Sequence, residues 1–242
     1  MNTPERVPLC LIPARGGSKR IPRKNVARLG NKPLIAWSIA PALASGLFAA
    51  VVVSSEDEEI LSIARHYGAL AVPRPAELAD DNVTLREVCL AILPELSAET
   101  HATDLYLLTP TAPFRTAGTL RQAWACYLES GGSALVSVES WAYPPQWALT
   151  VCEGRLKPLF PEVYETARPL LPPALKHDGG HLITGIARFL AEKNFWGASA
   201  CPFYGPEAER LDIDLPEDFV RARTALERHG CLYEPSDYTT KV

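Results

Sequence analysis

Short apolar runs alternate with amphipathic helical patterns between residues 7 and 138, and this alternation limits the possible folds more than any other feature of the sequence. A continuous apolar run bounded by turn residues is typical of a parallel strand buried on both faces. Strands that alternate with helices form a doubly wound α/β sheet with right-handed crossovers. We therefore expect a mostly parallel sheet with strands at 7–13, 48–53, 69–72, 104–108 and 133–138, and helices at 34–44, 55–67, 84–93 and 116–129.

The alternation stops at Trp141, and regular structure is expected again only after about His181. The residues between them are rich in proline and in aromatic side chains, a composition that does not suit a mobile linker. We interpret 141–181 as an arm that packs against a second subunit, inserted into a domain formed by 1–140 and 182–242. After the arm we expect regular structure at 186–190, a strand near 198–204 and a last helix at 216–228.

The overall charge excludes some classes of partner. The 242 residues include 24 Lys and Arg against 28 Asp and Glu, a formal charge of −4, so we expect neither nucleic acid nor an anionic membrane as a partner. The apolar runs are too short for a membrane span, and the run at 7–14 is too short for a signal peptide. Six cysteines without a CxxC pair favour free thiols. We expect a soluble cytoplasmic protein.

The segment Arg15–Arg28, called the basic loop below, contains six basic residues and no acidic one. It directly follows the first expected strand, at the edge of the sheet where doubly wound folds bind ligands. Gly16 and Gly17 let backbone N–H groups approach a ligand, and Ser18 adds a hydroxyl group. The loop has neither the G-K-[ST] nor the G-x-G-x-x-G pattern. A solvated surface loop is the alternative, but the position and the charge contrast favour binding of an anion.

Asp212 and Asp214 flank Ile213 in a strictly alternating segment near the end of the chain. In a strand, residues two apart lie on the same face, so we expect both carboxylates to converge. Two carboxylates that leave room for phosphate oxygens and water suit Mg²⁺. In the alternative interpretation, Asp214 only caps the helix that begins at Pro216.

Four segments resemble those of one enzyme family. The run I-P-A-R-G-G-S-K-R-I-P-R-K-N at 12–25 is similar to the nucleotide-binding signature of the acylneuraminate cytidylyltransferases, which activate sialic and related acids. R-P-A-E-L-A-D-D at 74–81, P-T-A-P-F-R at 110–115 and D-I-D at 212–214 resemble three further motifs of that family, in the same order. The resemblance implies a Rossmann-like nucleotidyltransferase with a protruding dimerisation arm, which uses Mg²⁺ and transfers CMP from CTP to an acidic sugar.

The same resemblance implies roles for individual residues. Arg15, Lys24 and Asp214 would act in catalysis, and an attacked α-phosphate and a departing pyrophosphate both need fixed positive charge and N–H donors. Asp212 and Asp214 would bind the metal. Arg74 and the Val83–Thr84 region would lie beside the nucleoside. The residues expected to bind CTP are Ala14, Arg15, Gly16, Gly17, Ser18, Lys19, Lys24, Asn25, Arg74, Val83 and Thr84.

The acceptor is implied to be a nine-carbon sugar acid. Arg168 and Lys176 are spaced like two basic residues that the family's arm sends into the partner's active site; two ordinary exposed cations are the alternative. H-D-G-G-H at 177–181 and Gln146 resemble the H-D-A-G-Q and Y-P-x-Q segments of pseudaminic acid cytidylyltransferases, although His181 replaces their Gln. We therefore expect a pseudaminate-like acceptor. The residues expected to bind it are Thr109, Arg115, Gln146, Arg168, Lys176, His177 and Asp178.

Other functions stay open from the sequence. The acceptor could be another ulosonic acid, such as N-acetylneuraminate, legionaminate or Kdo. A non-catalytic nucleotide-sugar-binding module is a second alternative, but such a module needs neither Lys24 nor an aspartate pair. His177, Asp178 and His181 could suggest zinc, which the paired glycines and the missing fourth ligand disfavour. The expected assembly is a homodimer that exchanges arms.

Overall fold

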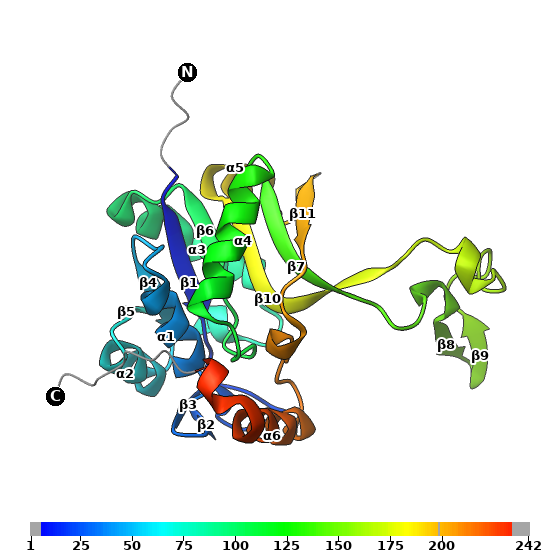
Figure 1. Ribbon diagram of the computed structural model, residues 1–242, viewed down its shortest axis with the longest axis horizontal. Coiled ribbons are helices and arrows are strands. Elements are labelled where there is room, and N and C mark those ends of the chain that lie inside the picture. The colour runs from blue at the N-terminus through cyan, green and yellow to red at the C-terminus, as the bar shows by residue number, and fades with distance from the viewer. Residues whose placement is uncertain (1–5, 198, 234–242) are drawn as a thin grey trace. The chain divides into compact units, whose positions relative to one another are not determined.

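The computed structural model describes residues 6–197 and 199–233, and its central element is a seven-stranded sheet (Figure 1). The strand order is β11-β7-β10-β6-β1-β4-β5. Strand β1 (Pro8–Pro13) pairs in parallel with β4 (Val51–Ser55) and β6 (Asp104–Leu107), and β4 pairs in parallel with β5 (Leu70–Pro73). Strand β11 (Ala200–Phe203) is parallel to β7 (Ala134–Ser140). The expected mostly parallel, doubly wound α/β sheet is confirmed.

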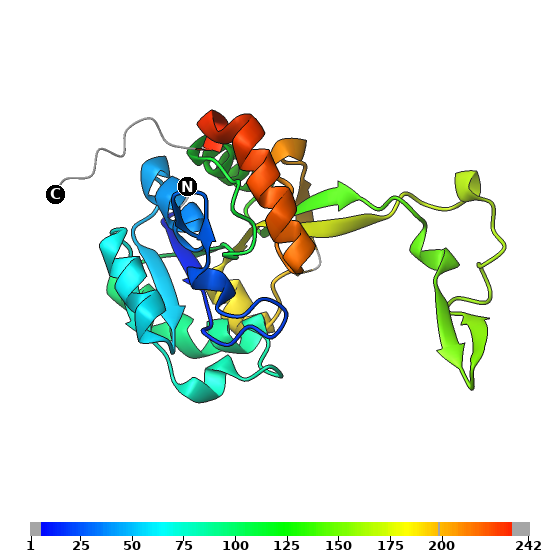
Figure 2. The ribbon, with the colours of Figure 1, turned by 90° about the horizontal axis from the view of Figure 1, so that it is seen from below.

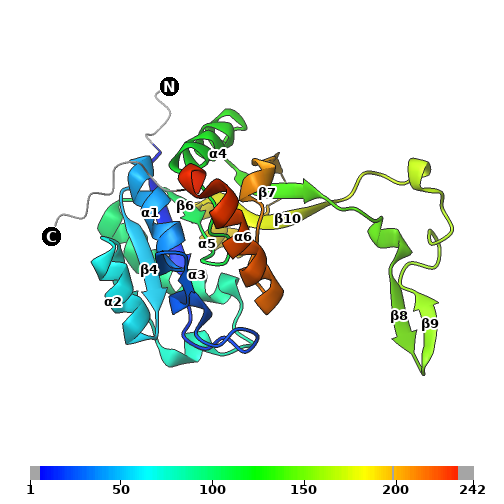
Figure 3. The ribbon, with the colours of Figure 1, turned by 60° about the horizontal axis from the view of Figure 1, so that its bottom comes forward.

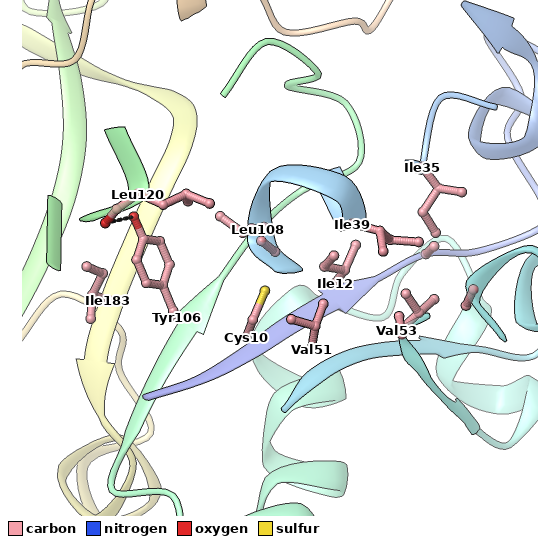
Figure 4. Close-up of a cluster of buried hydrophobic side chains, with 14 of the residues drawn as sticks. Cys10, Ile12, Ile35, Ile39, Val51, Val53, Tyr106, Leu108, Leu120 and Ile183 are labelled. Carbon is pink, nitrogen blue, oxygen red and sulfur yellow. Dashed lines mark hydrogen bonds between the residues drawn. The ribbon is translucent and has the colours of Figure 1, made fainter. Parts of the chain in front are cut away.

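Helices cover both faces of this sheet, and alternate residues of β1 therefore pack into two different cores. Cys10 and Ile12 pack with α1 (Ala36–Ser45), α2 (Glu58–His66) and α4 (Ala117–Glu129), in the cluster that Figure 4 shows. Leu9 and Leu11 face the opposite way and pack with α3 (Leu85–Thr100) and α5 (Ile186–Glu192). Burial on both faces explains why the strand sequence is continuously apolar.

A third apolar cluster lies around the hairpin that follows the basic loop. The loop contains a short 3₁₀ helix, η1 (Lys24–Val26), and leads into β2 (Arg28–Leu29) and β3 (Lys32–Pro33). The last helix, α6 (Pro216–Tyr233), packs beside β2 (Figure 3). Buried Leu29, Ile213 and Phe219 join these elements in one cluster. No helix among the residues described has the length and apolar character needed to cross a bilayer.

Strand β10 (Leu175–Gly185) begins inside the segment that the sequence suggested was irregular, and it lies antiparallel to β6. Two glycines, an aspartate and two histidines interrupt the apolar pattern that would have revealed it. The segment expected at 186–190 forms helix α5, and the strand expected near 198–204 is β11; residue 198 itself lies outside the described residues.

Several helix boundaries differ from the expected ones: α1 begins at Ala36 and not at 34, and α6 continues to Tyr233, beyond the expected end at 228. Helix α3 does not end at Pro94 but continues to Thr100, because its buried stripe continues through Leu93 to Leu96, and packing outweighs the missing backbone N–H. Helix α2 is capped by Asp57, whose carboxylate accepts the N–H groups of the next residues, whereas Ser55 belongs to β4.

The chain divides into two compact units, 1–137 with 178–242, and Val138–His177. The second unit contains η3 (Pro145–Trp147), the hairpin of β8 (Leu149–Cys152) with β9 (Arg155–Pro158), and η4 (Arg168–Leu170). Within it, many large apolar side chains are exposed to solvent: Trp141, Tyr143, Leu149, Val151, Leu156, Leu159, Phe160, Leu170 and Leu175.

Candidate active site

A cavity of about 300 Å³ lies at the carboxyl edge of the sheet, where the segments after β1, β5 and β6 meet. Figure 2 shows the basic loop (dark blue) and the segment after β5 (cyan) on the same side of the molecule. The second of these segments includes the 3₁₀ helix η2 (Ala76–Ala79). Of the residues predicted to bind ligands, the cavity brings together Arg15, Ser18, Lys24, Asn25, Arg74, Val83 and Thr109.

The first turn of the basic loop folds against the start of α2. The Gly16 N–H donates to Oε1 of Glu56 at 2.7 Å, and a Cβ atom at this position would overlap the carboxylate of Asp57. Only glycine allows this close approach. Gly17 is exposed with open space around its Cα, so its backbone can meet a ligand. Asn25 fixes the loop from within, because its Nδ2 donates to the Arg15 carbonyl at 2.9 Å.

Each cation of the loop tip lies beside an acid that the fold supplies from elsewhere. Arg15 and Lys19 both contact Asp81, at 2.7 and 2.5 Å. Arg23 contacts Asp57 and Glu59, and the more distant pair of Arg20 with Asp214 measures 3.8 Å. The basic loop has no acids of its own, and its positive charge is therefore balanced by carboxylates from other segments at the edge of the sheet.

Lys24 is the most enclosed of these cations, with 12% of its side chain exposed. Its Nζ donates to the Ile213 carbonyl at 2.6 Å and lies 3.2 Å from Oδ1 of Asp214. The basic loop and the predicted metal-binding segment, which lie at opposite ends of the sequence, therefore meet directly.

Leu211–Asp214 is an extended irregular segment and not the expected strand. The Ile213 N–H donates to the Thr111 carbonyl at 2.8 Å, and its buried side chain leaves Asp212 and Asp214 exposed, as alternation requires. Asp218, in the first turn of α6, accepts the N–H groups of Asp214 and Leu215 and so ties the segment before the helix to it. The Asp214 carboxylate itself contacts Lys24.

The aspartate pair has the donors that Mg²⁺ prefers. A Cβ atom at Gly179 would lie 3.3 Å from Oδ2 of Asp212, so the glycine leaves room for this carboxylate. Slightly more than half of the Asp214 side chain is exposed, which leaves space for phosphate oxygens. Within the described residues, no group of three or more His, Cys, Asp or Glu side chains could hold a metal by itself. The two carboxylates fit a metal that takes its remaining ligands from substrate and water.

Arg74 and Thr84 make hydrogen bonds that stabilise the segments around the cavity. Arg74 is buried, and its Nη2 donates to Oε2 of Glu56 at 3.1 Å and to the Ala14 carbonyl at 3.3 Å. Burial lowers the pKa of Arg74, and Glu56 opposes the shift. Thr84 forms a capping box with Glu87 at the start of α3. Val83 lines the cavity itself.

Arg115, predicted to bind the acceptor, is fully buried beneath the cavity. Its guanidinium donates to the Gly180 carbonyl at 2.7 Å, to Oγ of Ser38 at 2.8 Å and to the Thr109 carbonyl. Burial lowers the pKa of Arg115 to about 10. Thr109 lines the cavity, while its Oγ1 donates to the Gly179 carbonyl at 3.0 Å. Arg115 therefore ties the loop after β6 to the glycine pair of β10.

The H-D-G-G-H segment forms a buried polar network. Oδ1 of Asp178 accepts from the Ser137 hydroxyl and from the Gly180 N–H at 2.9 Å. Nδ1 of His181 lies 2.6 Å from the Tyr106 hydroxyl. Burial, with help from the Arg115 charge, lowers the pKa of His181 to about 3. Ser137 links the two residues, because its hydroxyl donates to Asp178 and accepts the His181 N–H at 2.6 Å. No group of three or more His, Cys, Asp or Glu side chains could hold a metal among the described residues, so the zinc alternative finds no support there.

Four residues predicted to bind the acceptor, Gln146, Arg168, Lys176 and His177, belong to the unit Val138–His177. Lys176 pairs with Glu139 at 2.6 Å. Arg168 lines a cavity of about 520 Å³ within that unit, together with Trp141 and several prolines. Their predicted contact with the acceptor rests on the sequence.

Sequence reasoning missed several residues of the site. Asp80, Asp81, Leu78 and Ala79 line the cavity, and Glu56 joins the basic loop to Arg74. The resemblance at 74–81 was a signal for the first four. Nothing in the sequence pairs Glu56 with Gly16.

An α/β sheet with a glycine-containing basic loop after its first strand, whose Lys24 contacts Asp214, defines a nucleotidyltransferase. The cytidylyltransferase family model matches residues 9–150. The chain belongs to the cytidylyltransferase family.

Curated relatives resemble the chain over most of its length. The pseudaminic acid cytidylyltransferase of Campylobacter jejuni is 35% identical over 89% of this chain and 94% of that protein. The CMP-N,N'-diacetyllegionaminic acid synthase of Legionella pneumophila is 33% identical over 90% and 96%. The N-acylneuraminate cytidylyltransferase of Escherichia coli is 32% identical over 89% of this chain, which spans about half of that protein.

Solved structures support the fold. A CMP:2-keto-3-deoxy-manno-octonic acid synthetase, solved in complex with CTP, has a TM-score of 0.64 at 17% identity, and the match covers 92% of this chain and 99% of that one. A 4-diphosphocytidyl-2C-methyl-D-erythritol synthase from Anaerococcus prevotii gives the same TM-score and coverage at 10% identity. At these identities the likeness concerns the fold.

Proposed function

We propose that this enzyme transfers CMP from CTP to the anomeric hydroxyl of a nonulosonic acid and releases pyrophosphate. The observation that carries the proposal is the cavity in which the basic loop meets Arg74 and Thr109, with Lys24 directed at Asp214. Relatives that match about nine tenths of the chain are named for pseudaminic, legionaminic and N-acylneuraminic acids, which supports a nine-carbon acceptor.

The geometry suits direct displacement at the α-phosphate of CTP. The bond from the sugar oxygen to the α-phosphorus forms as the bond from the α-phosphorus to the bridging oxygen breaks. Pyrophosphate leaves with that oxygen, and the proton of the sugar hydroxyl passes to solvent water. Arg15 and Lys24 would neutralise the charge on the phosphates, and the free backbone at Gly17 would approach their oxygens. Lys24 is held by the Ile213 carbonyl and by Asp214, so its ammonium group is oriented before substrate binds.

Asp212 and Asp214 would hold Mg²⁺, whose charge screens the triphosphate and the leaving pyrophosphate. Lys24, which contacts Asp214, would bind the same phosphate chain. Asp178 and Arg115 would act by fixing the glycine pair 179–180, against which Asp212 lies.

Among possible acceptors we favour a pseudaminate-like acid, because the relative from Campylobacter jejuni carries that name. The legionaminate-type acceptor is the second candidate, supported by a match of nearly equal identity and coverage. A non-catalytic binding module is disfavoured by the enclosed Lys24 and its aspartate partner.

We further propose that the unit Val138–His177 joins two copies into a homodimer. Its exposed aromatic and aliphatic side chains form more apolar surface than a monomer usually presents to water. Two copies related by a two-fold axis would cover that surface reciprocally. Because CTP is a cytoplasmic nucleotide and the described cysteines are free thiols, we place the reaction in the cytoplasm.

Release of pyrophosphate tests the function. The purified protein is mixed with CTP, Mg²⁺ and one sugar acid at a time: pseudaminate, legionaminate, N-acetylneuraminate or Kdo. Turnover should be highest with pseudaminate. A legionaminate preference would select the second acceptor, and binding of CTP without turnover on any acid would select the non-catalytic module.

A further inference from the structure

Asp81 holds the two cations at the entrance of the basic loop. Its Oδ1 accepts from Nη1 of Arg15 at 2.7 Å, and its Oδ2 lies 2.5 Å from Nζ of Lys19. Arg15 and Asp81 both line the cavity. Two carboxylate oxygens that bridge two cations make the contacts that two oxygens of a phosphate group would make. The position between Arg15 and Lys19 therefore already holds an anion that belongs to the protein.

We propose that Asp81 is a specificity-determining residue, an internal counter-anion that reserves the position between Arg15 and Lys19 for polyphosphates. This inference rests on the proposed function, in which the basic loop binds the triphosphate of CTP. A ligand with one carboxylate gains little by replacing Asp81, because it exchanges one carboxylate for another. A polyphosphate brings several anionic groups and also reaches Lys24, so it displaces Asp81 at a net gain.

The surroundings of Asp81 suit such an exchange. The residue lies in a short turn between η2 and α3, closed by the Val83 N–H donating to the Asp80 carbonyl at 3.1 Å. The side chains of Asp81 and Lys19 are 40% and 83% exposed, so water can solvate both after they separate. The Lys19 hydrogen bond, followed by that of Arg15, lowers the pKa of Asp81, which keeps the carboxylate charged.

The second substrate gives this arrangement a purpose. The proposed acceptor is itself an acid with one carboxylate, and it must not occupy the triphosphate site. An internal carboxylate excludes a single carboxylate by competition, without a steric barrier against the much larger nucleotide. The number of negative charges on a substrate, and not its shape, would therefore decide which substrate binds at the basic loop.

Binding measurements on Asp81→Asn test the proposal. Inorganic pyrophosphate, CTP and cytidine are titrated into wild type and variant by calorimetry, with Mg²⁺ and without acceptor. Because two exposed ion pairs no longer compete, pyrophosphate and CTP should bind roughly three- to tenfold more tightly. Cytidine, which has no phosphate, should bind equally to both proteins.

Two further variants test whether the effect depends on the negative charge at position 81. Glu77→Gln removes the same unit charge from an exposed position on η2, and its gain for pyrophosphate should stay below about twofold. Asp81→Glu keeps the anion and should bind pyrophosphate much like wild type. N-acetylneuraminate, the single-carboxylate probe, should compete with pyrophosphate in Asp81→Asn and not in wild type.

Unchanged or weaker pyrophosphate binding by Asp81→Asn overturns the proposal, as does equal competition by N-acetylneuraminate in both proteins. Failure of the proposed function looks different: wild type itself would bind neither pyrophosphate nor CTP.

Discussion

Nζ of Lys24 lies 3.2 Å from Oδ1 of Asp214, although 190 residues separate them in the chain. The contact joins the loop after the first strand to the segment before the last helix, and Lys24 also lines the cavity that we assign to CTP. The Lys24 side chain is enclosed, whereas the Asp214 carboxylate beside it is exposed. A ligand that enters from solvent therefore meets both charges.

Removal of the Lys24 charge should impair turnover. Lys24→Ala should reduce turnover at least tenfold, about 1.4 kcal/mol of transition-state stabilisation, because one fixed charge at the phosphates is lost. Pyrophosphate release measures the effect. Arg65→Ala is the matched control, since Arg65 is an exposed cation on α2 that pairs with Glu58. Normal turnover of a folded Lys24→Ala protein would refute the assignment.

Neutralising either metal-site aspartate should change the metal requirement and not the fold. Asp212→Asn and Asp214→Asn should each lose Mg²⁺-dependent turnover, because an amide oxygen binds Mg²⁺ far more weakly than a carboxylate. Titration of Mg²⁺ against product formation, with thermal unfolding alongside, measures both properties. Glu217→Gln, an exposed acid at the start of α6, controls for local charge. An unchanged Mg²⁺ requirement in both aspartate variants would rule out the metal pair.

His181 should make the stability depend on pH. Its pKa is about 3 when folded, with Tyr106 and Arg115 as its polar neighbours, against about 6.5 when unfolded. Between these values only the unfolded chain takes up the proton. The free energy of unfolding should therefore fall as pH decreases from 6.5 towards 3, by up to about 1.4 kcal/mol per pH unit.

Urea unfolding at pH 7, 6 and 5 measures this slope. His181→Gln keeps a hydrogen-bond partner for Tyr106 but cannot titrate, so its slope should be shallower than that of wild type. His66→Gln, at an exposed position on α2, should retain the wild-type slope. Equal slopes for wild type and His181→Gln would contradict a neutral buried His181.

Mixing two inactive variants tests whether active sites are shared between subunits. Asp214→Asn and Arg168→Ala are combined under conditions that allow subunit exchange. If Arg168 serves the partner's site, each heterodimer has one site with both defects and one with neither, and about half of the activity per heterodimer returns. If each chain supplies its own Arg168, mixing restores nothing. A fully active monomer in light scattering would already exclude the dimer.

The parts of the fold that could be predicted are those whose signal is local. Strands β1, β4 and β6 contain continuous apolar runs because both faces are buried, so they could be located from sequence. Strand β10 could not, since Gly179 and Gly180 replace side chains where Asp212 and Ser137 approach. The end of α3 was misjudged for a related reason: Pro94 is a local signal, and the distant core that overrides it is not.

The site, like the fold, has parts with a local sequence signal and parts that depend on distant contacts. The basic loop could be predicted as an anion site from its composition and its position after a strand. The acids that balance it could not, because Asp81 and Asp214 reach the loop only through folding. Arg115 was predicted to bind the acceptor from its motif, whereas the structure places its guanidinium against backbone carbonyls. A motif identifies the residue but not the direction in which its side chain points.

Strand β1 packs into a separate core on each face and then continues, through the Ala14 N–H bonded to the Ser54 carbonyl, directly into the basic loop. The backbone therefore passes from its most constrained stretch to an open one within two residues. Amide protons of Leu9–Ala14 should exchange only with global unfolding, while those of Gly17–Ile21 should exchange freely. The loop can thus rearrange around a nucleotide from a fixed starting point, and the sheet does not have to move with it.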